Sequence, residues 1–550
     1  MIVSNTITGT LVASGFVIAL AISGPAYATA DPAPAAAQQT DKDAAQKLVS
    51  STADHTKFEA LQADFKSGPE VTKACLECHT EAAKQIHKTK HWTWEYKNPD
   101  TGQLLGKKHV INNFCTAVAS NEDHCSACHI GYGWSDNKFD FTVEENVDCL
   151  VCHDTTGTYK KLPGLAGHPN YKTMEWPPNS GRLRPPTDLK KVAQNVGKTS
   201  RKNCGACHFR GGGGDAIKHG DLDSSLETPM RYLDIHMDAE GLNFACAKCH
   251  VTDAHEVPGS RYGPTASDTN GAQIRGSKET RNPATCQACH GNAPHDQADA
   301  KLNDHTRKIA CQTCHIPAYA RGPRHTKMSW DWSTAGRLDE QGKRIRTRNS
   351  IGKVRYDSNK GHFTYDRYVI PEYKWFNGKV KYTLFGDKVD GSGVVKINEF
   401  LGGPYDPDSR IWPLRVFRGK QMYDKGLQTL AVLHTTGNDD TAFWKTYDWD
   451  KALATGMKAV GSEYSGSMGF VETEMTWPIT HTVAPKEDAL QCEQCHTKGG
   501  RLTGIEGVYL PARDRIVAMD TIGFSLALLA LVSVLVHGGI RIFVSRKNKG

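Results

Sequence analysis

Residues 112–153 read NNFCTAVASNEDHCSACHIGYGWSDNKFDFTVEENVDCLVCH. Two Cys-x-x-Cys-His motifs lie close together in this stretch, one at 125–129 and one at 149–153. A further cysteine, Cys115, precedes the first of them and belongs to no motif. Positions i, i+3 and i+4 fall on one face of a helical turn, so the two thiols and the imidazole meet the same group. This spacing is typical of covalent c-type haem attachment, in which the histidine becomes an axial iron ligand.

The same motif occurs eight times along the chain and takes sixteen of the seventeen cysteines. Random placement of this chain's cysteines and histidines gives roughly 0.02 such motifs. A disulfide scaffold would not place a histidine after every pair, and zinc would need two pairs per ion. We therefore predict eight covalent c-type haems, and we number the motifs first to eighth in chain order. The attachment cysteines are Cys75, Cys78, Cys125, Cys128, Cys149, Cys152, Cys204, Cys207, Cys246, Cys249, Cys286, Cys289, Cys311, Cys314, Cys492 and Cys495. The predicted proximal iron ligands are His79, His129, His153, His208, His250, His290, His315 and His496.

The N-terminus indicates export from the cytoplasm. An apolar run at 11–22 is followed by small residues, so we predict a signal peptide at 1–30, cleaved after Ala28 or Ala30. Because 1–9 contain no Lys or Arg, an uncleaved anchor is the alternative. Residues 31–52, rich in Ala, Gln and Asp, are predicted to be a flexible spacer.

The C-terminus indicates a membrane anchor. Residues 521–540 contain no acid, Lys or Arg and are long enough to cross a bilayer. The basic tail at 541–550 predicts a cytoplasmic C-terminus, with the haem-binding part at the periplasmic face of the membrane. A buried core helix is the alternative. His537 and Arg541 lie one turn apart on one face, which predicts contact with a quinol-oxidising cytochrome b subunit; interfacial polarity without a partner is the alternative.

The intervening chain divides into a cysteine-rich and a cysteine-free part. Residues 53–315 hold seven motifs joined by Gly-, Pro- and Asn-rich segments. Residues 316–491 hold no cysteine and are predicted to be a haem-free insert or cap of the same catalytic domain, followed by the eighth haem segment at 492–512. Strand periodicity is nearly absent, so we predict a mainly α fold with long loops wrapped around a packed stack of haems, with one transmembrane helix.

The chain has enough histidines outside the motifs to give most of the haems a second histidine ligand. Of twenty-four histidines, eight belong to motifs and one lies in the predicted span. The candidates for the distal iron position lie near a motif, in segments with few other histidines. They are His55, His91, His219, His236, His255, His295, His305 and His481. The net charge of +7 omits two propionates on each haem, so it does not indicate a nucleic-acid partner.

The chain resembles the octahaem tetrathionate reductase family of multihaem cytochromes c, which is related more distantly to hydroxylamine oxidoreductases and pentahaem nitrite reductases. The resemblance covers most of the predicted exported part. It rests on the eight motifs and on segments that include Pro69-Glu70-Val71-Thr72, His91-Trp92-Thr93-Trp94, Asn112-Asn113-Phe114-Cys115, Gly131-Tyr132-Gly133-Trp134, Val196-Gly197-Lys198, Lys218-His219-Gly220-Asp221, Trp330-Asp331-Trp332-Ser333 and His481 with Ala484-Pro485-Lys486.

The resemblance implies seven bis-histidine relay haems and one catalytic haem, at the second motif. There the family has a lysine amine in place of a distal histidine and a cysteine beside it. We map the cysteine to Cys115 and the lysine to Lys198, with Lys190, Lys191 and Lys202 as nearby alternatives. The predicted catalytic residues are therefore Lys198, Cys115 and His129. The C-terminal span departs from the soluble members of the family and indicates a membrane-coupled version.

These observations predict a membrane-anchored reductase that passes electrons through the haems to tetrathionate, nitrite or hydroxylamine. The expected substrates are thus small inorganic anions or nitrogen compounds, which cationic residues would attract. The alternative is a non-enzymatic electron conduit between a quinol-oxidising membrane protein and soluble acceptors.

Overall fold

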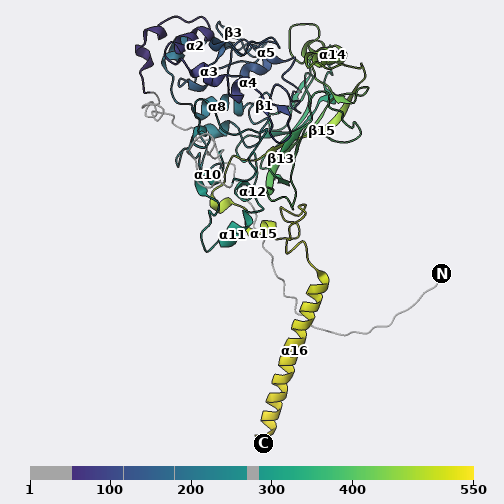
Figure 1. The fold of residues 1–550 in the computed structure, drawn as a ribbon. Helices are drawn as coiled ribbons and strands as arrows, with labels where there is room; N and C mark the ends of the chain where they lie inside the picture. Colours follow the sequence, from purple (N-terminus) through teal and green to yellow (C-terminus); the bar gives the residue numbers. More distant parts are fainter. Residues whose placement is uncertain (1–51, 116, 179, 269–283, 550) are drawn as a thin grey trace, which may run out of the picture. The chain divides into compact units, whose positions relative to one another are not determined.

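The computed structural model describes residues 52–115, 117–178, 180–268 and 284–549. The predicted signal peptide and almost all of the predicted spacer lie outside the described residues. The account that follows concerns the unit that begins at Ser51 and is drawn in Figure 1.

Short helices separated by long loops make up the described part of 53–315, as the sequence predicts. Side chains of Ser67, Thr89, Asp188 and Ser200 cap four of these helices by accepting a hydrogen bond from a backbone N–H of the first turn. The helices are η1 His55–Lys57, η2 Glu59–Leu61, α2 Gly68–Leu76, α3 Ala82–Ile86, α4 Lys90–Thr93, α5 Glu122–Cys125, η3 Ser126–Cys128, η4 Glu144–Asn146, α6 Leu150–His153, α7 Leu189–Gln194, α8 Arg201–His208, η5 Ser224–Glu227, α9 Cys246–Cys249, α10 Gln287–His290, α11 Ala300–His305 and α12 Cys311–His315. Two hairpins of two-residue strands, β1 Tyr96–Lys97 with β2 Leu104–Leu105 and β3 Met174–Glu175 with β4 Leu183–Arg184, interrupt them.

A nine-stranded sheet corrects the prediction of a mainly α fold. The strand order is β11-β15-β13-β5-β8-β7-β6, and β14 and β9 also pair with β13. The strands are β5 Thr326–Asp331, β6 Arg346–Arg348, β7 Val354–Asp357, β8 Gly361–Asp366, β9 Glu372–Phe376, β11 Val395–Lys396, β13 Arg410–Asp424, β14 Thr429–Leu430 and β15 Met468–Pro478. A separate pair joins β10 Val380–Tyr382 to β12 Asn398–Phe400. The cysteine-free part of the chain is thus built mainly from strands.

The longest strand explains why strand periodicity was not visible in the sequence. β13 is buried at nearly every position, and β15 pairs with it antiparallel over eleven residue pairs, so the two run side by side in Figure 1. A strand covered on both faces has no polar face and therefore shows no alternation. β-branched and aromatic residues such as Ile411, Val416 and Phe417 favour the extended backbone instead.

The sheet shares its core with the stretch that precedes the second motif. Phe114 stacks on Phe417 of β13 with ring centroids 4.2 Å apart, and Trp477 of β15 lies 5.5 Å from Phe114. The Asn113 side chain donates a hydrogen bond to the carbonyl oxygen of Phe417 at 3.2 Å. Residues 326–478 therefore form one wall of the region around Cys115.

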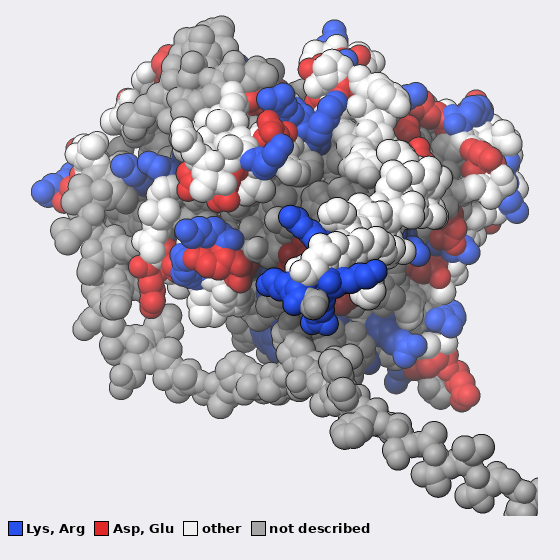
Figure 2. Space-filling model, turned by 90° about the horizontal axis from the view of Figure 1, so that it is seen from below, with Lys and Arg blue, Asp and Glu red and all other residues white. Residues whose placement is uncertain are grey.

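The remaining helices are η6 Trp332–Thr334, α13 Phe443–Thr446, α14 Trp449–Ala459, η7 Lys486–Asp488, α15 Cys492–Cys495 and α16 Val517–Lys547. Within the described residues, α16 is the one helix with the length and apolar composition needed to cross a bilayer, and its most apolar stretch is not buried against the rest of the chain. In Figure 2, blue Lys and Arg side chains gather at the end of an apolar helix; the last turn of α16 contains Arg546 and Lys547.

Candidate functional site

The histidine of most motifs closes an α-helical turn onto the first cysteine. The backbone N–H of His79, His153, His250, His290 and His496 donates to the carbonyl oxygen of the first cysteine of its motif, over 2.8–3.1 Å. The second motif differs, because the N–H of His129 donates to Ser126 O at 2.8 Å. That turn is the 3-10 helix η3, which is wound more tightly and aims the following residue differently.

Seven motif histidines each face another histidine at a nearly constant separation. Their ring centroids lie 6.0–6.5 Å apart. Two imidazoles on opposite sides of one metal, each with a metal–nitrogen bond of about 2 Å, place their ring centres roughly 6 Å apart. The spacing therefore fits one iron atom between the two rings. The pairs are His79 with His55, His208 with His91, His153 with His255, His290 with His236, His250 with His481, His315 with His295 and His496 with His305.

Backbone carbonyls orient several of these rings. The Nδ1 atom of His153 lies 2.8 Å from Gly197 O, that of His250 lies 3.0 Å from Pro258 O, and that of His305 lies 2.8 Å from Lys301 O. An Nδ1–H that donates to a carbonyl fixes the tautomer and leaves Nε2 as the metal-binding atom. The structure thus places seven of the eight histidines proposed for the distal position opposite a motif histidine. In the described residues His219 makes no such ring contact with a motif histidine and lies next to Lys218 instead.

His129 is the exception among the eight motif histidines. Its ring is 1% exposed, and its Nε2 lies 2.7 Å from the carbonyl oxygen of Trp92. Its Nδ1 is buried without a hydrogen-bond partner among the described residues. Burial lowers the pKa of this imidazole to about 3. Five aromatic rings surround it at centroid distances of 4.8–6.0 Å, those of Trp92, Trp94, Trp134, Phe139 and Phe141. In this arrangement Nε2 faces a carbonyl, not a second imidazole.

A buried lysine lies beside the second motif. Lys218 is 7% exposed, and its amine lies 5.8 Å from the centre of the Phe114 ring. Burial holds the pKa of Lys218 well below its usual value; the cations Arg261 and Lys107 act in the same direction, whereas Cys128 and Cys115 oppose it. Among the described residues no hydrogen bond or ion pair reaches this amine. A neutral, unpaired amine can act as a metal ligand.

A second buried lysine at this motif has a different environment. The Lys161 amine lies 2.6 Å from His129 O, 2.9 Å from Gly131 O and 3.0 Å from a carboxylate oxygen of Asp148. Tyr132 and Tyr159 also donate hydrogen bonds to that carboxylate. All three N–H donors of the Lys161 ammonium group therefore have acceptors within the protein, which indicates a structural role.

The lysine chosen from the sequence lies elsewhere. Lys198 is exposed, and its neighbour Gly197 accepts the hydrogen bond from His153 of the third motif. Lys190 and Lys191 lie in α7, and Lys202 is exposed on α8. Cys115 does lie near the second motif, since it contributes to the pKa values of Cys125 and Lys218. The structure thus brings Cys115 near Cys125 and near Lys218, and not near Lys198.

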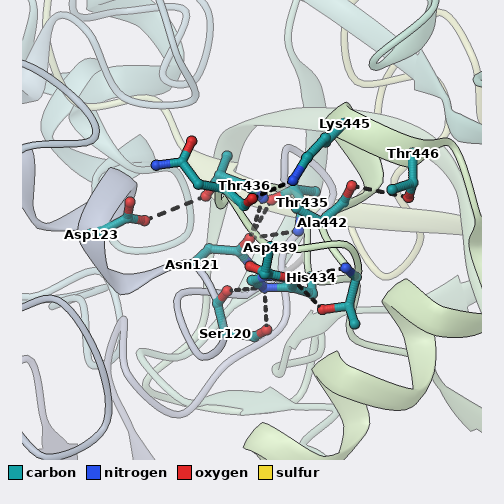
Figure 3. Close-up of polar contacts among 12 residues, drawn as sticks. Ser120, Asn121, Asp123, His434, Thr435, Thr436, Asp439, Ala442, Lys445 and Thr446 are labelled. Atoms are coloured by element: carbon teal, nitrogen blue, oxygen red, sulfur yellow. Dashed lines mark hydrogen bonds and ion pairs between the residues drawn. The ribbon is translucent and has the colours of Figure 1, made fainter.

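A polar clamp from the sheet-containing part holds the segment that leads into the second motif (Figure 3). Asn121 accepts a hydrogen bond from the N–H of Thr435 at 2.7 Å and donates one to Leu433 O at 3.0 Å. The His434 ring lies 2.6 Å from Ser120 O on one side and 3.1 Å from a carboxylate oxygen of Asp439 on the other. The clamp fixes the chain direction just before Cys125 by contacts that no local sequence pattern reveals.

Sulfur atoms of different motifs lie close together. Hydrogen-bond contacts join Cys75 to Cys149, Cys128 to Cys207, Cys246 to Cys204 and Cys311 to Cys286. Cys249 lies near Cys289, Cys314 lies near Cys495, and Cys152 lies near Cys204. The motifs therefore follow one another in space as first, third, fourth, fifth, sixth, seventh and eighth, with the second branching from the fourth.

The structure places residues at this site that the sequence did not predict, and no local sequence pattern distinguishes them from other residues. Lys218 adjoins His219, which was chosen for its imidazole, and Trp92, Trp94 and Trp134 belong to segments already noted for the family resemblance. A lone lysine is usually a solvated surface residue, so only its burial distinguishes it.

Comparison with known proteins agrees with these motifs. A family model described as "Cytochrome c bacterial" matches residues 327–499, and one described as "Cytochrome c554 and c-prime" matches residues 74–154. The chain is similar to the octaheme cytochrome c from Shewanella oneidensis, with 43% identity and a TM-score of 0.71 over 82% of this chain and 96% of that one. It is also 24% identical over 248 residues to an uncharacterised protein of Archaeoglobus fulgidus, covering 38% of this chain and 81% of that protein. The chain thus carries covalently bound c-type haems.

Proposed function

Because this chain belongs to the octahaem cytochromes c, we propose that it is an oxidoreductase that reduces a small oxyanion or nitrogen compound at the haem of its second motif. Tetrathionate, nitrite and hydroxylamine are the substrates to test. The observation that carries the proposal is the contrast between seven paired motif histidines and the enclosed ring of His129. A haem held between two imidazoles relays electrons, whereas catalysis needs an axial position that can open.

At the second motif we assign the iron-binding amine to Lys218 in place of the His129 imidazole. Lys218 is buried, unpaired in the described structure and close to Cys128, and its depressed pKa favours the neutral form that binds metal. The His129 Nε2 already faces Trp92 O. Lys218 would hold the iron, and Cys115, which lies near the same motif, would remain available to contact a substrate.

The cations around this motif support an anionic substrate. Lys107 and Arg261 each act on the ionisation of groups at the motif. Within the described residues no ion pair with a carboxylate joins either of them. A field of one sign in a buried site raises the local concentration of ions of the opposite sign.

The order of the motifs supports electron entry at the membrane side. The eighth motif precedes α16 directly in the chain, and the seventh, sixth, fifth and fourth motifs connect it to the second. With α16 as a membrane anchor, the basic tail would lie in the cytoplasm and a quinol-oxidising cytochrome b would be a suitable donor. Removal of residues 517–550 should release a soluble protein that keeps eight haems; continued membrane association would contradict the anchor.

A relay function is the second candidate, and one observation favours it. The first and third motifs lie beyond the branch to the second motif, so they form an arm that the path from the eighth motif does not need. A pure relay would show low-spin haems only and no turnover of the three substrates.

Replacement of Lys218 by Met tests the assignment. We expect eight haems, an altered spin state or axial ligand at one haem in electron paramagnetic resonance spectra, and a fall in kcat/KM of about a hundredfold or more, as for loss of a directly acting group. Lys198→Met is the matched control and should behave as the wild type, because that side chain is exposed. His129→Gln should keep the iron ligand. A ligand change in His129→Gln but not in Lys218→Met would overturn the assignment.

A further inference from the structure

Lys327 is a third buried lysine, and the proposed reaction gives it no role so far. It lies on β5, is 4% exposed, and holds its amine 3.5 Å from the centre of the Phe363 ring and 4.0 Å from that of Trp330. Within the described part of the chain, no hydrogen bond and no carboxylate within 4.0 Å reaches this amine. Its nearest neighbours are thus the faces of aromatic rings.

An ammonium group without a counter-ion is costly to bury. Burial holds the pKa of Lys327 well below its usual value and Lys360 and Arg415 lower it further, whereas Cys115 and Asp357 oppose this. The ring faces of Phe363 and Trp330 favour the cationic form. Lys161, by comparison, is buried against Asp148 and two carbonyl oxygens. Lys327 therefore has the environment of a cation that lacks its anion.

Arg415 fixes the position of Lys327 relative to Lys218. Its side chain on β13 is fully buried and donates hydrogen bonds to the carbonyl oxygens of Ile217, Lys218 and Lys327. One guanidinium thus joins the backbones of both lysine-bearing segments. Phe114 lies between them, with its ring 5.8 Å from the Lys218 amine and 6.5 Å from the Trp330 ring, and Cys115 follows it in the chain.

We propose that the Lys327 amine binds the negatively charged oxygen of a small oxyanion substrate next to Cys115. This inference rests on the proposed function of the second-motif haem and names the residue that selects anions there. The bound anion provides the negative charge that no carboxylate of the described chain provides. The aromatic faces contact the amine without accepting its protons in ordinary hydrogen bonds, so these protons can donate to the anion. Charge-assisted hydrogen bonds of this kind are roughly twice as strong as neutral ones.

The test compares a charged ligand with an uncharged one. Nitrite is an anion at neutral pH, whereas hydroxylamine is largely uncharged, so both are titrated into the oxidised protein while the haem spectrum is recorded. We expect Lys327→Met to weaken nitrite binding at least tenfold and to change hydroxylamine binding less than threefold. Lys374→Met, an exposed lysine on β9 of the same sheet, is the matched control and should change neither.

Each outcome bears on the inference. Unchanged nitrite affinity in Lys327→Met, or equal loss for both ligands, would overturn it. If Lys327→Met does not fold with eight haems, Lys327→Gln, which keeps a hydrogen-bond donor but removes the charge, must show the same selective loss. Failure of the wild-type protein to bind or reduce either compound would instead refute the proposed function, so the two failures are distinguishable.

Discussion

The strand-built part at 326–478 supplies most of the large apolar core, whereas the haem-binding part at 55–315 adds some residues to it, such as Phe114 and Ile217, and otherwise carries only small clusters. The large cluster runs through β5, β8, β13 and β15 and includes Phe417, Trp330 and Met475. In the haem-binding part the clusters are small, such as the one of Ala83, Ile86, Trp92 and Val147. The difference teaches that covalent cofactors replace side-chain packing in one part and not in the other, because haem itself supplies apolar surface.

The largest expected effect follows from removing the haems. In protein made without haem attachment, we expect backbone amides of β13 and β15 to remain protected from hydrogen exchange at least about a hundredfold more than those of α8, α10 and α12, because local stability follows local packing. Hydrogen exchange followed by mass spectrometry measures this. Equal loss of protection in both parts would show that the sheet also depends on the haems and would remove the contrast.

A smaller effect is expected from one core side chain of the sheet. Phe417→Ala deletes a ring that is 0% exposed and stacked on Phe114, and should lower the free energy of unfolding by about 3–5 kcal/mol. Tyr405→Ala is the control, because Tyr405 is 92% exposed and should change stability by less than about 0.5 kcal/mol. Denaturant titrations of both variants with full haem content provide the comparison. Equal effects of the two variants would mean that the sheet core is not where the stability resides.

The smallest effect concerns an ion pair at the end of the sheet. Burial raises the pKa of Asp357, but the hydrogen bond and charge of Arg344, 2.6 Å away, hold it below its usual value. A carboxylate with a depressed folded pKa stabilises the protein above its unfolded pKa, and this contribution is lost as the pH falls through the folded pKa. Arg344→Gln should therefore cost about 0.5–1 kcal/mol at pH 7, and the difference from wild type should shrink below about pH 4.

Urea midpoints measured between pH 3 and pH 7 check this prediction. Arg346→Gln is the matched variant, because Arg346 lies 3.6 Å from the same carboxylate and should have a weaker effect. A difference between wild type and Arg344→Gln that does not depend on pH would argue against the ion pair as its origin.

More of the structure of the haem-binding part than of the sheet could be predicted from the sequence. The helical turns at Cys149 and Cys246, and the long loops between them, follow from short-range patterns. β13 was missed because both of its faces are buried, which removes the alternation that marks a strand. The complete motif predicts His129 as an iron ligand, and this stays a prediction; the direction of its ring depends on the η3 turn and on Trp92, which the motif does not reveal.

The sequence by itself determined the cofactor, its attachment points and the apolar C-terminal span, since each is written in residues a few positions apart or in one continuous run. Only the tertiary structure decided which histidines face each other, that His129 is enclosed by aromatic rings, and that Lys218 and Lys327 are buried beside Cys115. Contacts such as Arg415 with Lys218, or His250 with His481, join residues far apart in the chain. Such contacts leave no periodic signal, because they depend on how the whole chain packs and not on the spacing of neighbours.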